Sequence, residues 1–459
     1  MNRISRHGGI LAVLASAMSF ASLAGIAGIA AADDLIVVDV DAHAVSSDQA
    51  GALFAFDPTA PIDAAPIIVA AADAGAPFEY IAGVAVSPLD GSAFTADWGT
   101  VSAAVVHRVD CATGAVTEAA NDSRFIQPFA LAFLPDGRLI VADWEADPSG
   151  LGPDSLGGIG HGAIFIVDVR SCTIGCPVAL LSDGSNHPFG PSVVTAFEDP
   201  VGVQHDGMRN RILVADLGAP PSLGWTTAIY AVDIVTGDVS VVSTDPSFQA
   251  LISLGIEPDG TILAVDRGNF SGPGDAFVWE VDPLLPVDAN GGLLSGGSQY
   301  SYVEDIDVDL AGRIFLIDSG DWDPVSGSFI VPPGVFEIDP TIPNSNNNGV
   351  LINQSVEMVY PVAIATRQGA CVASGRLAVN RSAARNSAAV RLQFVDGTCL
   401  QPPWSFCVDQ FIDGALDGLT LTGEGAPSSP NSVRLYEHSD PVTTMKLRRM
   451  GSDLVFASN

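Results

Sequence analysis

The chain has 459 residues, of which 47% are apolar, enough for one large core or two domains. Its formal charge is −34, and the residues before Ala370 carry the whole excess, with 45 acidic side chains against 11 basic ones. Such a field repels nucleic acid and anionic membrane surfaces, so we expect no nucleic-acid partner, and it favours solubility and cation binding.

The first 32 residues predict a secretory signal peptide. Arg3 and Arg6 precede an uncharged stretch from 8 to 32, rich in Ala, Gly, Leu and Ile, which closes on three alanines. An uncleaved membrane anchor is the alternative because the stretch is rather long, although its Ala and Gly content disfavours a stable span. Cleavage would leave a secreted or periplasmic protein that begins near Asp33 and has no membrane span.

Export makes the six cysteines disulfide candidates. Three lie early and three late, so either one bridge crosses the two regions or some thiols stay free. Cys172 and Cys176 are close enough for a local loop, but the sequence leaves the connectivity open. The full set is Cys111, Cys172, Cys176, Cys371, Cys399 and Cys407.

An apolar run that ends in Asp recurs six times after the signal segment. Two examples are "AFTADWG", which contains Asp97, and "LIVADWE", which contains Asp143. A second run that also ends in Asp follows each one 13 to 25 residues later. The first set ends at Asp39, Asp97, Asp143, Asp216, Asp266 and Asp318, and the second at Asp57, Asp110, Asp168, Asp233, Asp282 and Asp339. Six units with two such strands each indicate a structural repeat.

Five units also have a preceding strand and a turn, such as "PFALAFLPDG" and "PVGVQHDG". Pro-Asp-Gly between two β-rich runs predicts a hairpin turn, because Pro presets φ and Gly takes a positive φ. The first unit lacks this strand, which appears instead at the far end as "YPVAIAT", Tyr360 to Thr366. Pairing of that strand with the first unit predicts an all-β, six-bladed β-propeller closed by a C-terminal inner strand.

These strands resemble NHL-type repeats, which places residues 33–369 with the TolB-like and gluconolactonase-like propellers. The match is loose in detail, since the usual Asn-His after the second strand is missing and "DRGNF" (266–270) keeps only the Asn. The resemblance implies that the strand-end Asp residues cap backbone N–H groups at the blade rim. From 370 to 459 the charge is balanced and short alternating strands predict a small accessory β domain of no recognised family.

The innermost strands have small residues at alternate positions, except in the last blade and, to a lesser degree, at Gln204 in the fourth. In the last blade "VEDIDVDLAG" places Asp305, Asp307 and Asp309 on one face, and the following strand ends in "DSGDWDP". Clustered carboxylates with backbone carbonyls suit Ca²⁺, although a solvated channel mouth is the alternative. The predicted metal ligands are Glu304, Asp305, Asp307, Asp318 and Asp321.

Three tryptophans follow the strand-end Asp residues and therefore lie on one rim of the predicted propeller. Aromatic rings beside acids suit stacking on a sugar or another flat ligand, although each ring can equally pack over its own blade edge. Gln204 breaks the small-residue pattern of the inner strands. The predicted ligand-binding residues are Trp98, Trp144, Trp322, Gln204 and Asp216.

No covalent-catalysis motif is present in the sequence, so the catalytic residues, if any, stay unknown. We therefore expect an exported module that binds a small molecule, a carbohydrate or a protein, with a possible Ca²⁺ site. The alternative is a metal-dependent hydrolase that resembles the gluconolactonase/regucalcin group, in which a channel cation polarises an ester or lactone. A lyase similar to the streptogramin-inactivating propellers is a third option without a clear catalytic His.

Overall fold

The computed structural model describes most of residues 34–367 and the strands of the C-terminal region. The described ranges are 34–42, 51–72, 75–99, 103–152, 159–189, 193–218, 227–268, 276–309, 311–323, 328–342, 348–355, 357–367, 380–382, 387–393, 404–407, 420–423, 433–436, 445–450 and 453–458. The predicted signal peptide lies outside the described residues. No helix among the described residues is long and apolar enough to cross a membrane.

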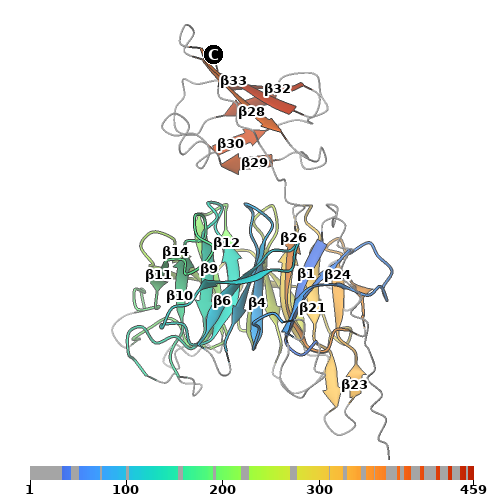
Figure 1. Cartoon of the computed structure of the whole chain (residues 1–459). Helices are drawn as coiled ribbons and strands as arrows, with labels where there is room; N and C mark the ends of the chain where they lie inside the picture. The colour runs from blue at the N-terminus through green and yellow to red at the C-terminus, as the bar shows by residue number, and fades with distance from the viewer. Residues whose placement is uncertain are drawn as a thin grey trace, which may run out of the picture.

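Six four-stranded antiparallel sheets stand around one axis and form a six-bladed β-propeller (Figure 1). Blades 1 to 3 consist of β26 (Pro361–Arg367), β1 (Asp34–Asp39), β2 (Ala52–Phe56) and β3 (Ile67–Ala71); β4 (Ile81–Val86), β5 (Ala93–Asp97), β6 (Val105–Val109) and β7 (Val116–Ala120); and β8 (Pro128–Phe133), β9 (Leu139–Asp143), β10 (Ala163–Val167) and β11 (Val178–Ser182). Each set runs from the inner strand at the axis to the outer strand.

Blades 4 to 6 repeat this order. They consist of β12 (Pro200–Asp206), β13 (Arg211–Asp216), β14 (Ala228–Asp233) and β15 (Val239–Ser243); β16 (Leu251–Ile256), β17 (Ile262–Asp266), β18 (Phe277–Val281) and β19 (Gly291–Gly296); and β20 (Val303–Val308), β21 (Ile314–Asp318), β24 (Gly334–Ile338) and β25 (Gly349–Asn353). A separate hairpin, β22 (Asp321–Asp323) and β23 (Ser328–Val331), extends from blade 6 (Figure 1).

The ring closes as the sequence predicts. Strand β26 pairs antiparallel with β1, with Ile364 opposite Val37 and Ala363 opposite Val38. Blade 1 therefore combines the last strand of the repeat region with the first three, which leaves no unpaired inner strand at the seam.

The apolar core lies between blades rather than inside one sheet. One buried cluster joins Ile140 and Ile164 of blade 3 to Val203 and Tyr230 of blade 4. Blade sheets are apolar on both faces because each face packs on a neighbour, which explains the nearly continuous apolar runs of the second strands.

The turns between inner and second strands mostly follow the predicted geometry. Gly91, Gly137, Gly260 and Gly312 all have φ between 69° and 86°. Blade 4 is the exception to the prediction from "PVGVQHDG": Gly207 does not take a positive φ, and Asn210 does, at 51°. Residues 207–210 join β12 to β13, and the residue with positive φ lies three positions after Gly207.

The two ends of the propeller differ in which turns they carry. We call the end with the inner-to-second-strand turns the hairpin end, and the end where each second strand finishes in Asp the cap end. The β22–β23 hairpin follows Asp318 and so belongs to the cap end.

Two features of the remaining chain bear on the predictions. Cys172 and Cys176 form a disulfide, with their Cα atoms 5.4 Å apart, and Cys111 is a buried free thiol. The C-terminal strands form a seven-stranded antiparallel sheet, and the domain boundary at 370 stays a prediction. These strands, in sheet order, are β27 (Asn380–Ser382), β28 (Ser387–Gln393), β33 (Asp453–Ser458), β32 (Met445–Met450), β31 (Val433–Tyr436), β30 (Thr420–Gly423) and β29 (Trp404–Cys407).

Candidate functional site

At the cap end, each blade has one Asp side chain that accepts hydrogen bonds from backbone N–H groups. Asp143 shows the pattern: its carboxylate accepts hydrogen bonds from the N–H groups of Ile126 (2.8 Å), Gln127 (2.9 Å) and Glu145 (3.2 Å). Equivalent bonds hold Asp39, Asp97, Asp216, Asp266 and Asp318. The predicted capping role is confirmed, and it satisfies N–H groups that the blade ladders leave unpaired.

Burial raises the pKa of four of these six carboxylates. All six are at most 1% exposed. Burial raises the pKa of Asp39 and of Asp143 to about 6, against the opposing effect of the backbone N–H donors. Burial likewise raises the pKa of Asp216 and of Asp318. Asp216, predicted as a ligand-binding residue, and Asp318, predicted as a metal ligand, therefore both lie in caps with backbone donors on their oxygens.

A hydrogen bond between two backbone groups is also repeated in every blade at the cap end. Its donors and acceptors are twelve residues placed around the axis. The residue after each cap Asp donates its N–H to the carbonyl oxygen of the residue just before an inner strand, as Trp98 does to Tyr80 at 3.0 Å. The donors are Val40, Trp98, Trp144, Leu217, Arg267 and Ser319, and the acceptors are Tyr360, Tyr80, Gln127, Asp199, Ala250 and Tyr302. We call this end of the channel the mouth. Its chemistry follows from which residue each blade places there.

Blades 2 and 3 make one side of the mouth aromatic. The Trp98 ring stacks on Tyr80, with ring centres 4.5 Å apart, and lies 5.5 Å from Trp144. Trp144 stacks in turn on Phe129 at 5.5 Å with an interplanar angle of 11°. All four rings are half-buried, so each keeps part of its surface open. The structure thus brings together two of the three predicted tryptophans; the side chain of Trp322 lies outside what the structure describes.

These rings also reach across to other blades. Trp144 and Phe129 pack against a buried cluster that contains Val201 of blade 4 and Ile252 of blade 5. Neither tryptophan is therefore confined to its own blade edge. The indole Nε1 atoms of Trp98 and Trp144 are buried and have no hydrogen-bond partner among the described residues. Such donors are uncommon in native proteins, which favours a role in binding.

Blades 5 and 6 make the opposite side of the mouth polar. Arg267 forms an ion pair with the buried carboxylate of Glu304 and lies over the Tyr302 ring, 4.7 Å from its centre. Glu304 also accepts hydrogen bonds from Ser319 Oγ (3.2 Å) and from the Tyr360 hydroxyl (3.3 Å). Burial lowers the pKa of Arg267. The pair is partly desolvated, and the Tyr and Ser hydroxyls offset that cost.

Tyr80 connects the two sides. Its pKa is raised, first by burial and then by the negative charge of Asp41, while the positive charge of Arg267 opposes the shift. Tyr302, Tyr360 and Tyr80 each raise the pKa of Arg267, against the larger lowering effect of burial. The backbone bonds of the cap end place the aromatic stack and the Arg267–Glu304 pair around the same channel opening. We call these residues together the mouth site: Tyr80, Trp98, Phe129, Trp144, Arg267, Tyr302, Glu304 and Tyr360.

The predicted channel acids bind the backbone of a neighbouring strand. Asp305 accepts a hydrogen bond from Ser253 Oγ of β16 and another from the Ile364 N–H of β26 at 2.9 Å. Asp307 accepts two from Thr366, from its N–H at 2.6 Å and from its Oγ1 at 2.9 Å. Burial raises the pKa of Asp305 to about 7 and also raises that of Asp307. Both carboxylates therefore bridge inner strands across the channel wall.

The remaining predicted residues lie apart from this arrangement. Asp309 accepts hydrogen bonds from the N–H groups of Ala311 and Arg313 in the turn after β20. Gln204 lies in β12, where its Oε1 accepts from the His205 N–H at 3.1 Å. Asp321 begins β22 and is half-buried.

These positions do not assemble a cation cage in the part of the chain that the structure describes. There, no group of three or more His, Cys, Asp or Glu side chains is arranged to hold a metal ion. Glu304, Asp305, Asp307 and Asp318 each use their oxygens on protein donors, so they fit a calcium ion poorly. The Ca²⁺ site stays a prediction.

Sequence reasoning missed Arg267, Tyr80, Phe129, Tyr302 and Tyr360. One signal was present: Arg267 follows a cap Asp, the position held by Trp98 and Trp144 in blades 2 and 3. The tyrosines precede inner strands, where no repeat residue marks them.

The fold and this site define a six-bladed propeller with a polar and aromatic mouth. Comparison with protein-family models finds no match, and comparison with curated proteins finds none. Among solved structures, TolB from Acinetobacter baumannii is similar, with 12% identity over 73% of this chain and 66% of that chain and a TM-score of 0.47.

Two further solved structures are similar. Hydrazine synthase from Kuenenia stuttgartiensis has 20% identity, 59% and 64% coverage of this chain and that chain, and a TM-score of 0.37. A gluconolactonase from Xanthomonas campestris has 17% identity, 58% and 79% coverage, and a TM-score of 0.37. This chain spans less than two thirds of the TolB and hydrazine synthase chains. At these identities the likeness concerns the fold alone.

Proposed function

We propose that the chain is an exported binding module and that the mouth site holds its ligand. The observation that carries this proposal is the arrangement, around one end of the channel, of four half-buried aromatic rings and an ion pair between half-buried Arg267 and buried Glu304. Aromatic surface with a few convergent polar groups is the usual composition of a small-molecule site.

The ligand we propose has a flat, weakly polar face and oxygen atoms at its edge, as a sugar ring does. The face stacks on Trp98 or Trp144, and the edge oxygens accept from the indole N–H groups and from the Tyr80 hydroxyl. Arg267 and Glu304 supply a donor and an acceptor that are fixed by their own pairing, which orients a polar ligand without a net charge.

The test is a tryptophan-fluorescence titration of the mature protein with defined sugars: glucose, maltotriose, cellotriose and chitotriose. We expect one of them to bind and to change the emission, and we expect Trp98→Ala and Trp144→Ala to weaken that binding at least ten-fold. Trp279→Ala is the matched control, because Trp279 is half-buried in β18 of blade 5, outside the mouth site. Equal loss in all three variants, or no response to any sugar, would contradict the proposal.

Export is supported by the disulfide between Cys172 and Cys176, which fits an oxidising compartment. We propose cleavage of residues 1–32. The intact mass of protein recovered outside the cytoplasm should then correspond to a chain that starts near Asp33; a mass that includes the first 32 residues would favour the retained anchor.

The predicted calcium ion needs a direct measurement. Metal content and melting temperature with and without EDTA decide it, with Asp307→Ala as the variant. A stoichiometric divalent ion, lost together with several degrees of stability on chelation, would support the Ca²⁺ site. No bound ion and an unchanged melt would remove that site, and with it the alternative of a metal-dependent hydrolase.

A further inference from the structure

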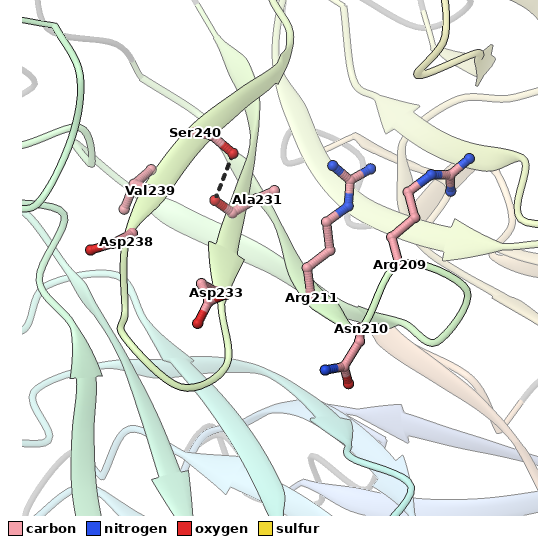
Figure 2. A pocket seen from close by; sticks show the side chains of 8 residues that line it. All are labelled: Arg209, Asn210, Arg211, Ala231, Asp233, Asp238, Val239 and Ser240. Atoms are coloured by element: carbon pink, nitrogen blue, oxygen red, sulfur yellow. Dashed lines mark hydrogen bonds between the residues drawn. The ribbon is translucent and has the colours of Figure 1, made fainter. Parts of the chain in front are cut away.

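A second concave site lies at the hairpin end of blade 4, at the opposite end of the propeller from the mouth site. It is a cavity of about 290 Å³ formed by the turn between β12 and β13 and the turn between β14 and β15. Its lining includes Arg209, Arg211, Ala231, Asp233, Asp238 and Ser240 (Figure 2). Two arginines in one cavity stand out in a propeller region, residues 33–369, with nine basic residues and 45 acidic ones.

The unusual turn of blade 4 creates the positive side of this cavity. Asn210, with φ 51°, reverses the chain between Arg209 and Arg211, and Figure 2 shows both guanidinium groups pointing the same way. Fully buried Asp206 pairs with both, through Arg209 Nη1 at 3.1 Å and Arg211 Nε at 2.9 Å. One carboxylate faces two guanidinium groups, so one positive charge is left uncompensated by this pairing.

Arg211 also has a donor to offer. Its Nη2 atom is buried and has no hydrogen-bond partner among the described residues. Guanidinium nitrogens match the geometry of carboxylate oxygens, and a buried donor without a partner is costly to maintain. An anionic group in the cavity would satisfy it.

The neighbouring turn supplies the negative side. Asp233 lies directly opposite Arg211 in the strand pairing, and its Oδ1 accepts from the N–H groups of Val235 and Thr236. Asp238 is exposed just before β15, where its carboxylate accepts a hydrogen bond from the Asn186 side chain. Figure 2 shows both residues on the hairpin that carries Ala231 and Ser240, with the Asp238 carboxylate directed away from the arginines. A simple anion in this cavity would be attracted by the arginines and repelled by the two carboxylates.

We propose that this cavity binds a small zwitterion with a carboxylate and an ammonium group, such as a free amino acid. The carboxylate accepts from Arg211 Nη2 and from Arg209, and the ammonium group lies toward Asp233, which is opposite Arg211 in the strand pairing. Ala231 and Val239 provide an apolar wall for the carbon chain. This site is independent of the mouth site, and either one can be disproved without affecting the other.

The test is calorimetric titration of the mature protein with L-alanine and 4-aminobutanoate, and with propionate and propylamine as the two half-ligands. We expect one zwitterion to bind at a single site, and each half-ligand to bind at least ten-fold more weakly because it leaves one charged side unpaired. Arg211→Gln should weaken binding at least ten-fold, and Asp233→Asn should reduce the difference between the zwitterion and propionate.

Two matched variants control for the loss of a turn residue. Arg313→Gln removes the equivalent hairpin pair of blade 6, where Arg313 Nε lies 2.6 Å from buried Asp309, and Asp110→Asn removes an Asp that caps the corresponding outer turn of blade 2. Both should keep wild-type binding, with circular dichroism confirming folding of every variant. The proposal is overturned by no heat with either zwitterion, by propionate or propylamine binding as tightly as the zwitterion, or by an equal loss in Arg313→Gln.

Discussion

Two junctions between neighbouring inner strands, β4–β8 and β20–β26, occupy equivalent places in the ring and are held in different ways. At β4–β8 the backbones approach closely: a Cβ atom on Gly83 would lie 2.1 Å from the Phe129 carbonyl oxygen. At β20–β26 the equivalent position is Asp305, which together with Asp307 reaches over to the N–H groups of Ile364 and Thr366. The β4–β8 junction leaves no room for a side chain at this position, whereas side chains make the contact at the β20–β26 junction.

The difference follows from how each strand is anchored. Strand β8 continues through a turn into β9 of its own blade, whereas β26 pairs with β1 at the other end of the repeat region and has no hairpin to hold it. The carboxyl groups of Asp305 and Asp307 on β20 supply a second set of hydrogen bonds to β26. The acids that suggested a metal in the sequence thus secure the closing strand.

The largest expected effect comes from the close junction. Gly83→Ala should destabilise the protein by about 2–3 kcal/mol, because the added Cβ meets a backbone oxygen that cannot move alone. Gly202→Ala should cost less and Gly255→Ala least, since their nearest atoms lie 2.9 Å and 3.3 Å from the added Cβ. Urea unfolding of the three variants measures the order; an equal cost at all three positions would show that close approach is not what fixes this junction.

At the closing junction, Asp307→Ala should cost about 2 kcal/mol, because it leaves the Thr366 N–H and hydroxyl without their acceptor. Asp307→Asn keeps one acceptor oxygen and should cost less than half as much. Denaturant unfolding of both variants checks this. Equal stability of the alanine variant and the wild type would mean that water replaces the carboxylate without loss.

The pH dependence separates the two junctions further. The pKa of Asp305 is raised to about 7 in the folded state, so between about pH 4 and pH 7 the folded protein binds more protons than the unfolded chain. Stability should therefore fall as pH rises through this window, and Asp39 and Asp143 add to the fall up to about pH 6. Asp305→Asn should remove about 1 kcal/mol of this fall, a reduced figure because the channel leaves part of the side chain in water.

Unfolding free energies of wild type and Asp305→Asn at pH 4, 5.5 and 7 test that sign. Asp97→Asn serves as the contrast, since its pKa is lowered by the His107 side chain and backbone donors despite burial. It should lose stability at neutral pH. A stability that rises with pH in the wild type, and equally in Asp305→Asn, would refute the raised pKa.

The smallest effect is expected at the position of β26 that corresponds to Asp305. Ala363→Gly should cost about 0.5–1 kcal/mol, because it mainly adds freedom to the unfolded chain and removes one buried methyl group. Thermal melts are sensitive enough to measure it. A loss as large as that of Gly83→Ala would show that the methyl group, not the carboxylates, holds the closing strand.

Much of the fold could be predicted because the repeat is local. The period of the apolar runs, the turn residues and the strand-end Asp pattern each involve neighbours in sequence, and Asp143 caps N–H groups only 16 and 17 residues away. Residues 360–366 match the inner strand that the first unit lacks, so the closure of the ring could be predicted from the sequence. Blade 4 was the local failure, since the short motif in "PVGVQHDG" did not reveal that Asn210 would reverse the chain.

The contact partners of individual side chains depended on how the blades are arranged around the axis. The amino-acid sequence alone determined a closed six-bladed propeller with capped strand ends and tryptophans on one rim. Only the tertiary structure decided that Asp305 binds Ile364, that Arg267 pairs with Glu304 beside Tyr80, and that Arg211 faces Asp233 in a cavity. The reason is physical: a repeat specifies which position faces the axis, while the residue opposite comes from another blade that sequence spacing does not place.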